Sequence, residues 1–152
     1  MNVDLYLGLL RTGERVLGES FRQVAEGHGD EPDVYRLCTT LAEQCEDHER
    51  RLGPIVGRYG ERPDDEPERF HADAISESRS GPVGLLRDLQ DLYLLASLVD
   101  VTWVTVRQAA LALRDEDLLT LIEDCEAETG VQLAWILTRM KQSAPQALLV
   151  AS

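Results

Sequence analysis

Basic residues are scarce in this sequence, and their scarcity excludes one broad class of function. The chain of 152 residues has 15 Lys and Arg against 28 Asp and Glu, which gives a formal net charge of −13. Nucleic-acid binding depends on clusters of Lys and Arg, and no such cluster is present. We therefore expect no nucleic-acid partner and an acidic, well-solvated surface.

The sequence also lacks a long uninterrupted apolar run. The longest apolar stretch, Leu92–Val106, contains Asp100 and is too short to cross a bilayer. Asp4, Arg11 and Glu14 break up the apolar residues near the N-terminus, so we expect no signal peptide. Together with an odd count of three cysteines, these features predict a cytoplasmic protein with reduced thiols and no membrane partner.

Aromatic residues are few, and good helix formers take their place. Aromatics make up 5% of the chain, β-branched residues are sparse, and Leu, Ala, Glu and Arg dominate. The hydrophobic content of 43% is enough for one core in a chain of this length. The composition predicts a single all-α domain over residues 1–152.

Glycine and proline divide the chain into four segments with helical periodicity. Gly27 ends the first segment, Pro32 suits the first turn of the second, and Pro145 closes the last. Within each segment, apolar residues recur at steps of three and four. Pro54 removes one backbone hydrogen bond, which predicts a kink or an early end near Gly53. The predicted helices cover about 2–26, 31–58, 82–114 and 116–142.

One connection is much longer than the other two. The polar linker 60–81 joins the second and third helices, whereas short turns join the other pairs. Four long helices with this spacing predict an antiparallel four-helix bundle. A linker that crosses the length of the bundle gives the ferritin-like arrangement, and one that stays at one end gives up-and-down topology.

Polar side chains interrupt the apolar seam of every predicted helix at about the same height. At a rise of 1.5 Å per residue, counting from the turns places all of them near mid-length. Thiol, imidazole and carboxylate groups at one level predict a central site for one transition-metal ion, Fe or Zn, or for a small ligand. In chain order, the six residues are Glu14, Cys45 and His48, Asp100, and Cys125 and Glu128.

This pattern resembles the ferritin-like di-metal carboxylate proteins over about residues 2–142. In that family two helices each supply a Glu and the other two each supply Glu-x-x-His. The resemblance implies that Glu14 and Asp100 match the single carboxylates, and that Cys45 and Cys125 begin the paired motifs. Cysteine replaces both bridging glutamates, and Glu128 stands in place of a histidine. These departures argue against standard di-iron chemistry and leave a single metal ion as the expectation.

Two other interpretations of the same residues are open. Buried cysteine often packs as a small hydrophobe, and His48 suits a core imidazole hydrogen-bonded to an acid. The protein is then a non-catalytic bundle that acts through dimerisation, as a homodimer, or through partner binding, and its polar core is structural. A third hypothesis is a redox pair formed by Cys45 and Cys125 across the core.

The remaining candidates are less specific. Trp103 and Trp135 are candidates for the wall of a cofactor pocket, although their helical spacing also suits the core. His28 and His71 fall in predicted connections and are expected to be solvated. No Gly-rich phosphate loop or Ser-His-Asp pattern is recognisable, so the sequence predicts no reaction and leaves open whether the protein is an enzyme.

Overall fold

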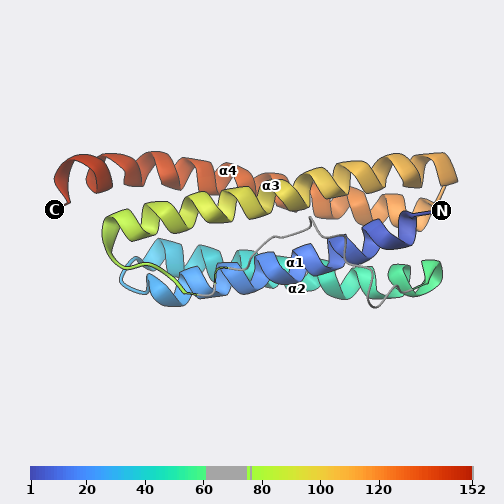
Figure 1. Cartoon of the computed structure of the whole chain (residues 1–152), viewed down its shortest axis with the longest axis horizontal. Coiled ribbons are helices and arrows are strands. Elements are labelled where there is room, and N and C mark those ends of the chain that lie inside the picture. Colours follow the sequence, from blue (N-terminus) through green and yellow to red (C-terminus); the bar gives the residue numbers. More distant parts are fainter. Residues whose placement is uncertain (61–74, 76, 152) are drawn as a thin grey trace.

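Four long α-helices make up most of the described chain, and the described residues contain no strand (Figure 1). The structure, a computed structural model, describes residues 1–60, 75 and 77–151. The all-α prediction is confirmed, and the predicted helix ends are correct to within one residue except at the end of the last helix. The elements are α1 Val3–Gly27, α2 Pro32–Tyr59, α3 Gly81–Leu113, α4 Glu116–Pro145 and the short π-helix η1 Gln146–Val150.

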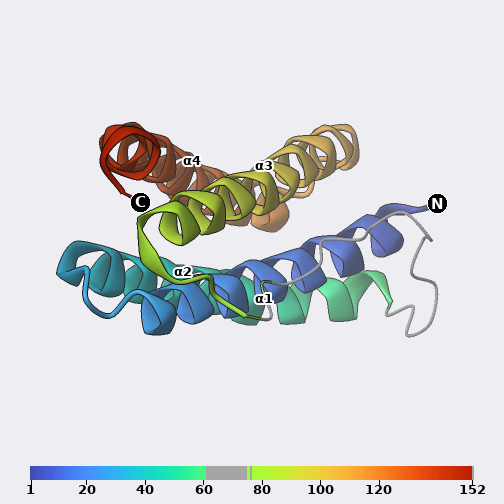
Figure 2. The same cartoon turned by 60° about the vertical axis from the view of Figure 1, so that its left-hand side comes forward.

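The helices pack in a closed order around one core. Helix α1 packs on α2 and α3, and helix α4 packs on α3 and α2. His28, which follows α1, contacts Asp88 near the start of α3, with 2.8 Å between Nε2 and Oδ2. Tyr59, the last residue of α2, hydrogen-bonds Asp115 just before α4. The two contacts lie at opposite ends of the molecule. Figures 1 and 2 show the end of α1 beside the start of α3 at one end, and the end of α2 beside the start of α4 at the other.

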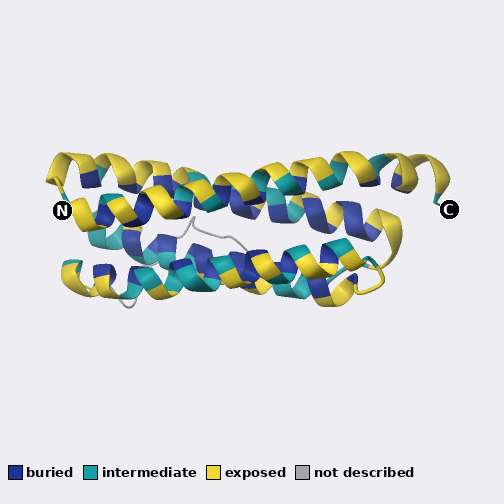
Figure 3. Ribbon diagram, turned by 180° about the vertical axis from the view of Figure 1, so that it is seen from behind, coloured by how far each residue is buried: buried dark blue, intermediate teal, exposed yellow. Residues whose placement is uncertain are grey.

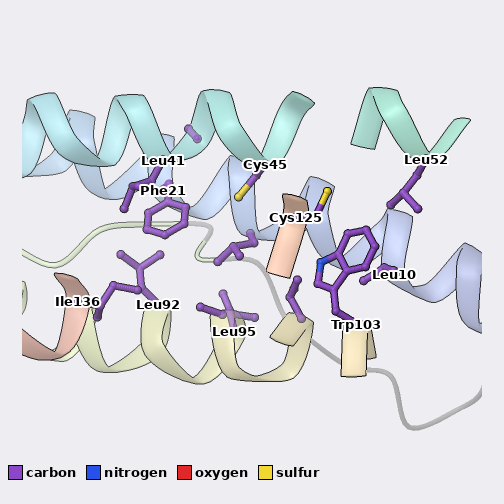
Figure 4. Packing of buried hydrophobic residues seen from close by; sticks show 14 of the residues in the cluster. Leu10, Phe21, Leu41, Cys45, Leu52, Leu92, Leu95, Trp103, Cys125 and Ile136 are labelled. Atoms are coloured by element: carbon purple, nitrogen blue, oxygen red, sulfur yellow. The ribbon is translucent and has the colours of Figure 1, made fainter. Parts of the chain in front are cut away.

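The apolar stripes predicted from the three- and four-residue steps face inward. Figure 3 shows buried residues on the inner sides of the helices and exposed ones on the outer sides. Phe21, Leu92 and Ile136 come together from α1, α3 and α4 (Figure 4), and each is fully buried. Burial of one such side chain stabilises the fold by roughly 1.5–3 kcal/mol. The bundle therefore rests on this continuous core.

Two prolines expected to stop or bend helices do not end them. Helix α2 continues through Pro54 to Tyr59, so the predicted early end near Gly53 is wrong. Helix α4 includes Pro145, and the chain stays helical to Val150 instead of ending at 142. Pro145 has a φ of −61° in the range that proline fixes. The wider turn that follows keeps its own bonding, since the Ala151 N–H donates to the Gln146 carbonyl at 2.8 Å.

Helix α3 is apolar on its outer side as well as its core side. Leu94 and Val101 point outward and are 68% and 54% exposed. By length and composition α3 is the one described helix that could cross a membrane, which is weak support because core helices share this property. The absence of a membrane partner therefore stays a prediction. The sequence pattern did not predict this exposed apolar face.

Candidate functional site

His48 lies at the centre of a buried hydrogen-bond network that reaches all four helices. Its Nδ1 lies 3.0 Å from Glu14 Oε1 on α1, and its Nε2 lies 3.1 Å from Glu128 Oε1 on α4. His48 and Glu14 are fully buried, whereas the Glu128 side chain is 38% exposed. An imidazole that contacts two carboxylates through both nitrogens donates from both, which requires its charged form.

The protonation of His48 follows from its partners. Burial lowers the pKa of this imidazole, but its hydrogen bonds to Cys125 and Glu14 outweigh that effect and raise the pKa to about 11. The side chain is therefore a cation at neutral pH. A buried charge costs several kcal/mol unless it is paired. Here the imidazolium is paired with an acid on each side.

Trp103 supplies the α3 member of the network. Its Nε1 donates to Glu14 Oε1 at 2.9 Å, so this oxygen accepts from both the indole and the imidazole. The rings of Trp103 and His48 meet edge to face, with centroids 6.3 Å apart. We call Glu14, His48, Trp103 and Glu128 the His48 network. Helical spacing indicated that Trp103 suits the core, and its burial agrees, but the pattern did not predict its bond to Glu14.

Both predicted cysteines lie beside the His48 network as free, buried thiols. Figure 4 shows Cys45 and Cys125 projecting into the same interior as Trp103. Gln132 Nε2 donates to Gln44 Oε1 at 3.1 Å and lies 3.8 Å from Cys45 Sγ. Burial raises the pKa of Cys45 and Cys125, so both are neutral thiols at neutral pH. The thiolate is the form that binds metals and reacts, so this environment disfavours both roles.

Comparisons of this chain with protein-family models, with curated proteins and with solved structures find no match. The resemblance to ferritin-like proteins therefore depends on the helix order and on the position of the polar residues.

The predicted metal ligands are brought together only in part. Glu14, Cys45, His48, Cys125 and Glu128 share one level, linked directly or as neighbours of the His48 network. Among the described residues, no group of three or more His, Cys, Asp or Glu is arranged to hold a metal ion. Metal binding therefore stays a prediction. Within the His48 network, the Glu14 Oε2 atom is buried and has no hydrogen-bond partner.

Asp100 and Trp135 lie apart from the His48 network. Asp100 is half-buried on α3, where burial raises the pKa of its carboxyl group. Within the described residues, no hydrogen bond joins Asp100 to the other predicted ligands. Trp135 packs half-buried against the core from α4. On α3 the residue that faces the network is Trp103, three residues after Asp100. Three residues fall short of a full helical turn, so the two side chains project about 60° apart around the helix axis.

A second ionic cluster around a buried carboxylate lies at one end of the bundle, and the sequence pattern did not predict it. Asp88 is fully buried and accepts from His28 Nε2 at 2.8 Å and from the Arg79 backbone and guanidinium at 2.9 and 3.0 Å. The expectation that His28 is solvated is wrong, since its exposure is 3%. Asp88 lies on the apolar seam, three residues after Leu85, and that position was the available signal. His71 lies outside the described residues.

Proposed function

We propose that this chain is a ferritin-like, non-catalytic helical bundle that acts by associating with a partner protein through an exposed apolar face of α3. The helix order supports the ferritin-like part. Helix α2 ends beside the start of α4, and α3 begins beside the end of α1, so α2 and α3 run in the same direction. In the ferritin-like arrangement, one long connection joins two helices that run in the same direction, and residues 60–81 are the long connection between α2 and α3 in this sequence.

The His48 network supports the non-catalytic part of the proposal. Its imidazolium puts a positive charge between carboxylates of α1 and α4, where a ferritin-like protein would hold metal. Both ring nitrogens are engaged, and the neighbouring thiols are neutral. His48 cannot act as base, nucleophile or ligand without breaking one of its two contacts to carboxylates. We therefore infer that the network fixes the packing of the four helices.

The observation that carries the association is the α3 outer face. Leu94 and Val101 on this face are more than half exposed, on a chain with a net charge of −13. Only two charged residues, Asp100 and Arg107, occur within Leu92–Leu113, and both project from the side that meets α4. The face extends for about 27 Å. Contiguous exposed apolar side chains are typical of interaction surfaces. We define the α3 outer face as Leu94, Leu98, Val101, Val104, Thr105, Gln108, Leu111 and Ala112.

A photocrosslinking amino acid at Val101 tests this proposal in the cells that make the protein. We expect a covalent adduct to a second polypeptide after illumination. The matched control is the same substitution at Val131 of α4, which is 62% exposed and lies outside the α3 outer face. Equal yields at the two positions, or no adduct at Val101, would contradict association through this face.

Binding of one metal ion or small ligand beside the His48 network is the second candidate, and one observation favours it. Glu14 Oε2 is buried without a partner, as expected of an atom that awaits a ligand. To bind a metal, His48 would release one carboxylate and the thiols would lose their protons. Elemental analysis of protein purified without chelator tests this candidate. Fe or Zn below about a tenth of an equivalent would rule out a tightly bound metal.

A further inference from the structure

We propose that the partner is a second copy of this chain, bound antiparallel through the α3 outer face around a two-fold axis level with Trp103. This inference rests on the proposed function and names its partner. In such a contact, each residue of one copy faces a residue of the other copy, and the two residue numbers add up to about 206. The two-fold axis makes every such contact occur twice. Leu94 then lies opposite Ala112, and Val101 lies opposite Thr105.

The charge distribution favours a second copy over other partners. A basic protein would be attracted to the many acidic side chains elsewhere on the chain, and an anionic membrane would be repelled by its net charge of −13. The α3 outer face carries no charged residue, so its complement is another uncharged apolar face. The chain itself supplies one of matching length.

Residue size along the α3 outer face favours the antiparallel direction. The first half has the larger apolar side chains, Leu94, Leu98 and Val101. The second half has Val104, Gln108 and Leu111 together with the smaller Thr105 and Ala112, which lie level with Val101 and Leu94 in the proposed register. Large residues pack best against small ones across a contact. Antiparallel helices place Leu94 against Ala112 and Val101 against Thr105, whereas parallel helices in the same register would place Leu94 against Leu94 and Ala112 against Ala112.

A pocket beside Thr105 lies next to the position that Leu98 of the other copy reaches in the proposed register. It has a volume of about 200 Å³ and lies where the start of α1 meets the last turns of α3. In the proposed register, Leu98 of one copy lies level with position 108 of the other, at the edge of this pocket. The symmetric contact repeats this placement at the second copy's pocket. The residues that line it are Asn2, Val3, Tyr6, Thr105, Val106 and Ala109.

Sedimentation velocity of the purified chain tests for the dimer. The chain has a mass of 17.0 kDa, so we expect a species of twice that mass. A contact through one helix face buries an area at the lower end of the range for specific interfaces. This predicts a dissociation constant in the micromolar range. Val101→Glu should weaken the dimer at least tenfold, whereas the matched Val131→Glu on α4 should leave it unchanged. A wild-type chain that stays monomeric at about 100 µM would overturn the inference.

Engineered cysteines test the antiparallel register. The three native cysteines are fully buried, so added surface thiols report alone. The double variant Leu94→Cys with Ala112→Cys should form an interchain disulfide under mild air oxidation, seen on a non-reducing gel. Leu94→Cys alone should not. A disulfide with Leu94→Cys alone places the two copies parallel and overturns the register.

The photocrosslinking result separates failure of this inference from failure of the proposed function. An adduct at Val101 of twice the chain mass supports both. An adduct to a different polypeptide, together with a monomeric purified chain, leaves the proposed function standing and overturns the second copy as partner. No adduct at Val101 removes the proposed function itself.

Discussion

At the scale of single residues, His48 carries the most consequential charge in the core. Its imidazolium and the Trp103 indole both hydrogen-bond Glu14, and the imidazolium is the charged partner of that carboxylate. Removing it leaves a buried carboxylate without its counter-charge. Because breaking one side of a buried ion pair costs about 3–5 kcal/mol, we expect His48→Ala to lower the free energy of unfolding by that amount. Urea denaturation measures the change.

The control for that prediction removes both charges. Replacing a buried ion pair by apolar residues of similar volume is often neutral, so Glu14→Leu with His48→Leu should recover much of the lost stability. A single His48→Ala variant that loses less than about 1 kcal/mol would mean that the pair does not carry a charge in the core.

The raised pKa of His48 makes stability depend on pH in a definite direction. The folded-state pKa of about 11 exceeds the unfolded value of about 6.5. The stabilisation from the imidazolium is therefore complete below about pH 6.5 and is lost as the pH rises toward 11. We expect the advantage of wild type over His48→Gln, measured by urea denaturation, to shrink between about pH 6 and pH 9. An advantage that grows over this range would contradict a charged His48.

The sequence predicted that polar residues meet at mid-bundle, but not which of them pair. Seam positions and the rise per residue place Glu14, His48 and Glu128 at one level, and the hydrogen bonds join them. Whether Trp103 or Asp100 of α3 faces the other polar residues depends on how that helix is rotated about its axis. Packing against the neighbouring helices sets this rotation, and the sequence pattern does not give it. Side-chain rotamers decide whether imidazole nitrogens face acids or a metal, and spacing alone carries no information on rotamers.

At the scale of helices, Asp115 joins two of them. Its carboxylate caps α4 by accepting from the Leu118 N–H at 3.1 Å, and it accepts from Arg58 at 2.9 Å and from the Tyr59 hydroxyl at the end of α2. Loss of a cap alone costs about 1 kcal/mol, and the contacts to α2 add to it. We expect Asp115→Ala to lower the free energy of unfolding by about 1–2 kcal/mol.

A neighbouring acid provides the control for Asp115. The Asp117 side chain lies in the first turn of α4 and is 84% exposed. Its replacement by Ala should change stability by less than about 0.5 kcal/mol. Amide hydrogen exchange at Leu118 gives a local measurement, because the lost cap bond should speed exchange there in Asp115→Ala only. Equal effects of the two substitutions would show that the cap and the α2 contacts contribute nothing.

Helix ends were predictable where local chemistry sets them and failed where packing does. Gly27 and Pro32 mark a turn through their own backbone preferences, and the helices end and begin there. Pro54 and Pro145 carry the same local signal, but neither terminates a helix. A proline removes only one donor, and the rest of the helix is held by side chains packed elsewhere. The exposed side of α3 was missed for a related reason, since an apolar run does not reveal how much of it neighbours cover.

At the scale of the whole molecule, charge and apolar surface are segregated. Among the described residues most acids belong to the other helices, while the α3 outer face carries no charged residue, on a chain with a net charge of −13. Two copies repel each other in most orientations. The exception is the approach that brings the two α3 outer faces together, which keeps the acidic surfaces furthest from the contact. The same segregation therefore favours solubility and restricts association to one face.

This segregation predicts how the dimer responds to salt. The α3 outer face, which forms the proposed contact, has no charged residue. The main electrostatic effect on dimerisation is therefore repulsion between two acidic chains. Salt screens that repulsion, since the Debye length falls to about 10 Å at 0.1 M and shortens further above it. The dissociation constant should therefore fall as salt rises from about 0.05 M to about 0.5 M, as measured by sedimentation equilibrium. An interface built on ion pairs would weaken over the same range, so a rising dissociation constant would place the contact on a charged surface instead of α3.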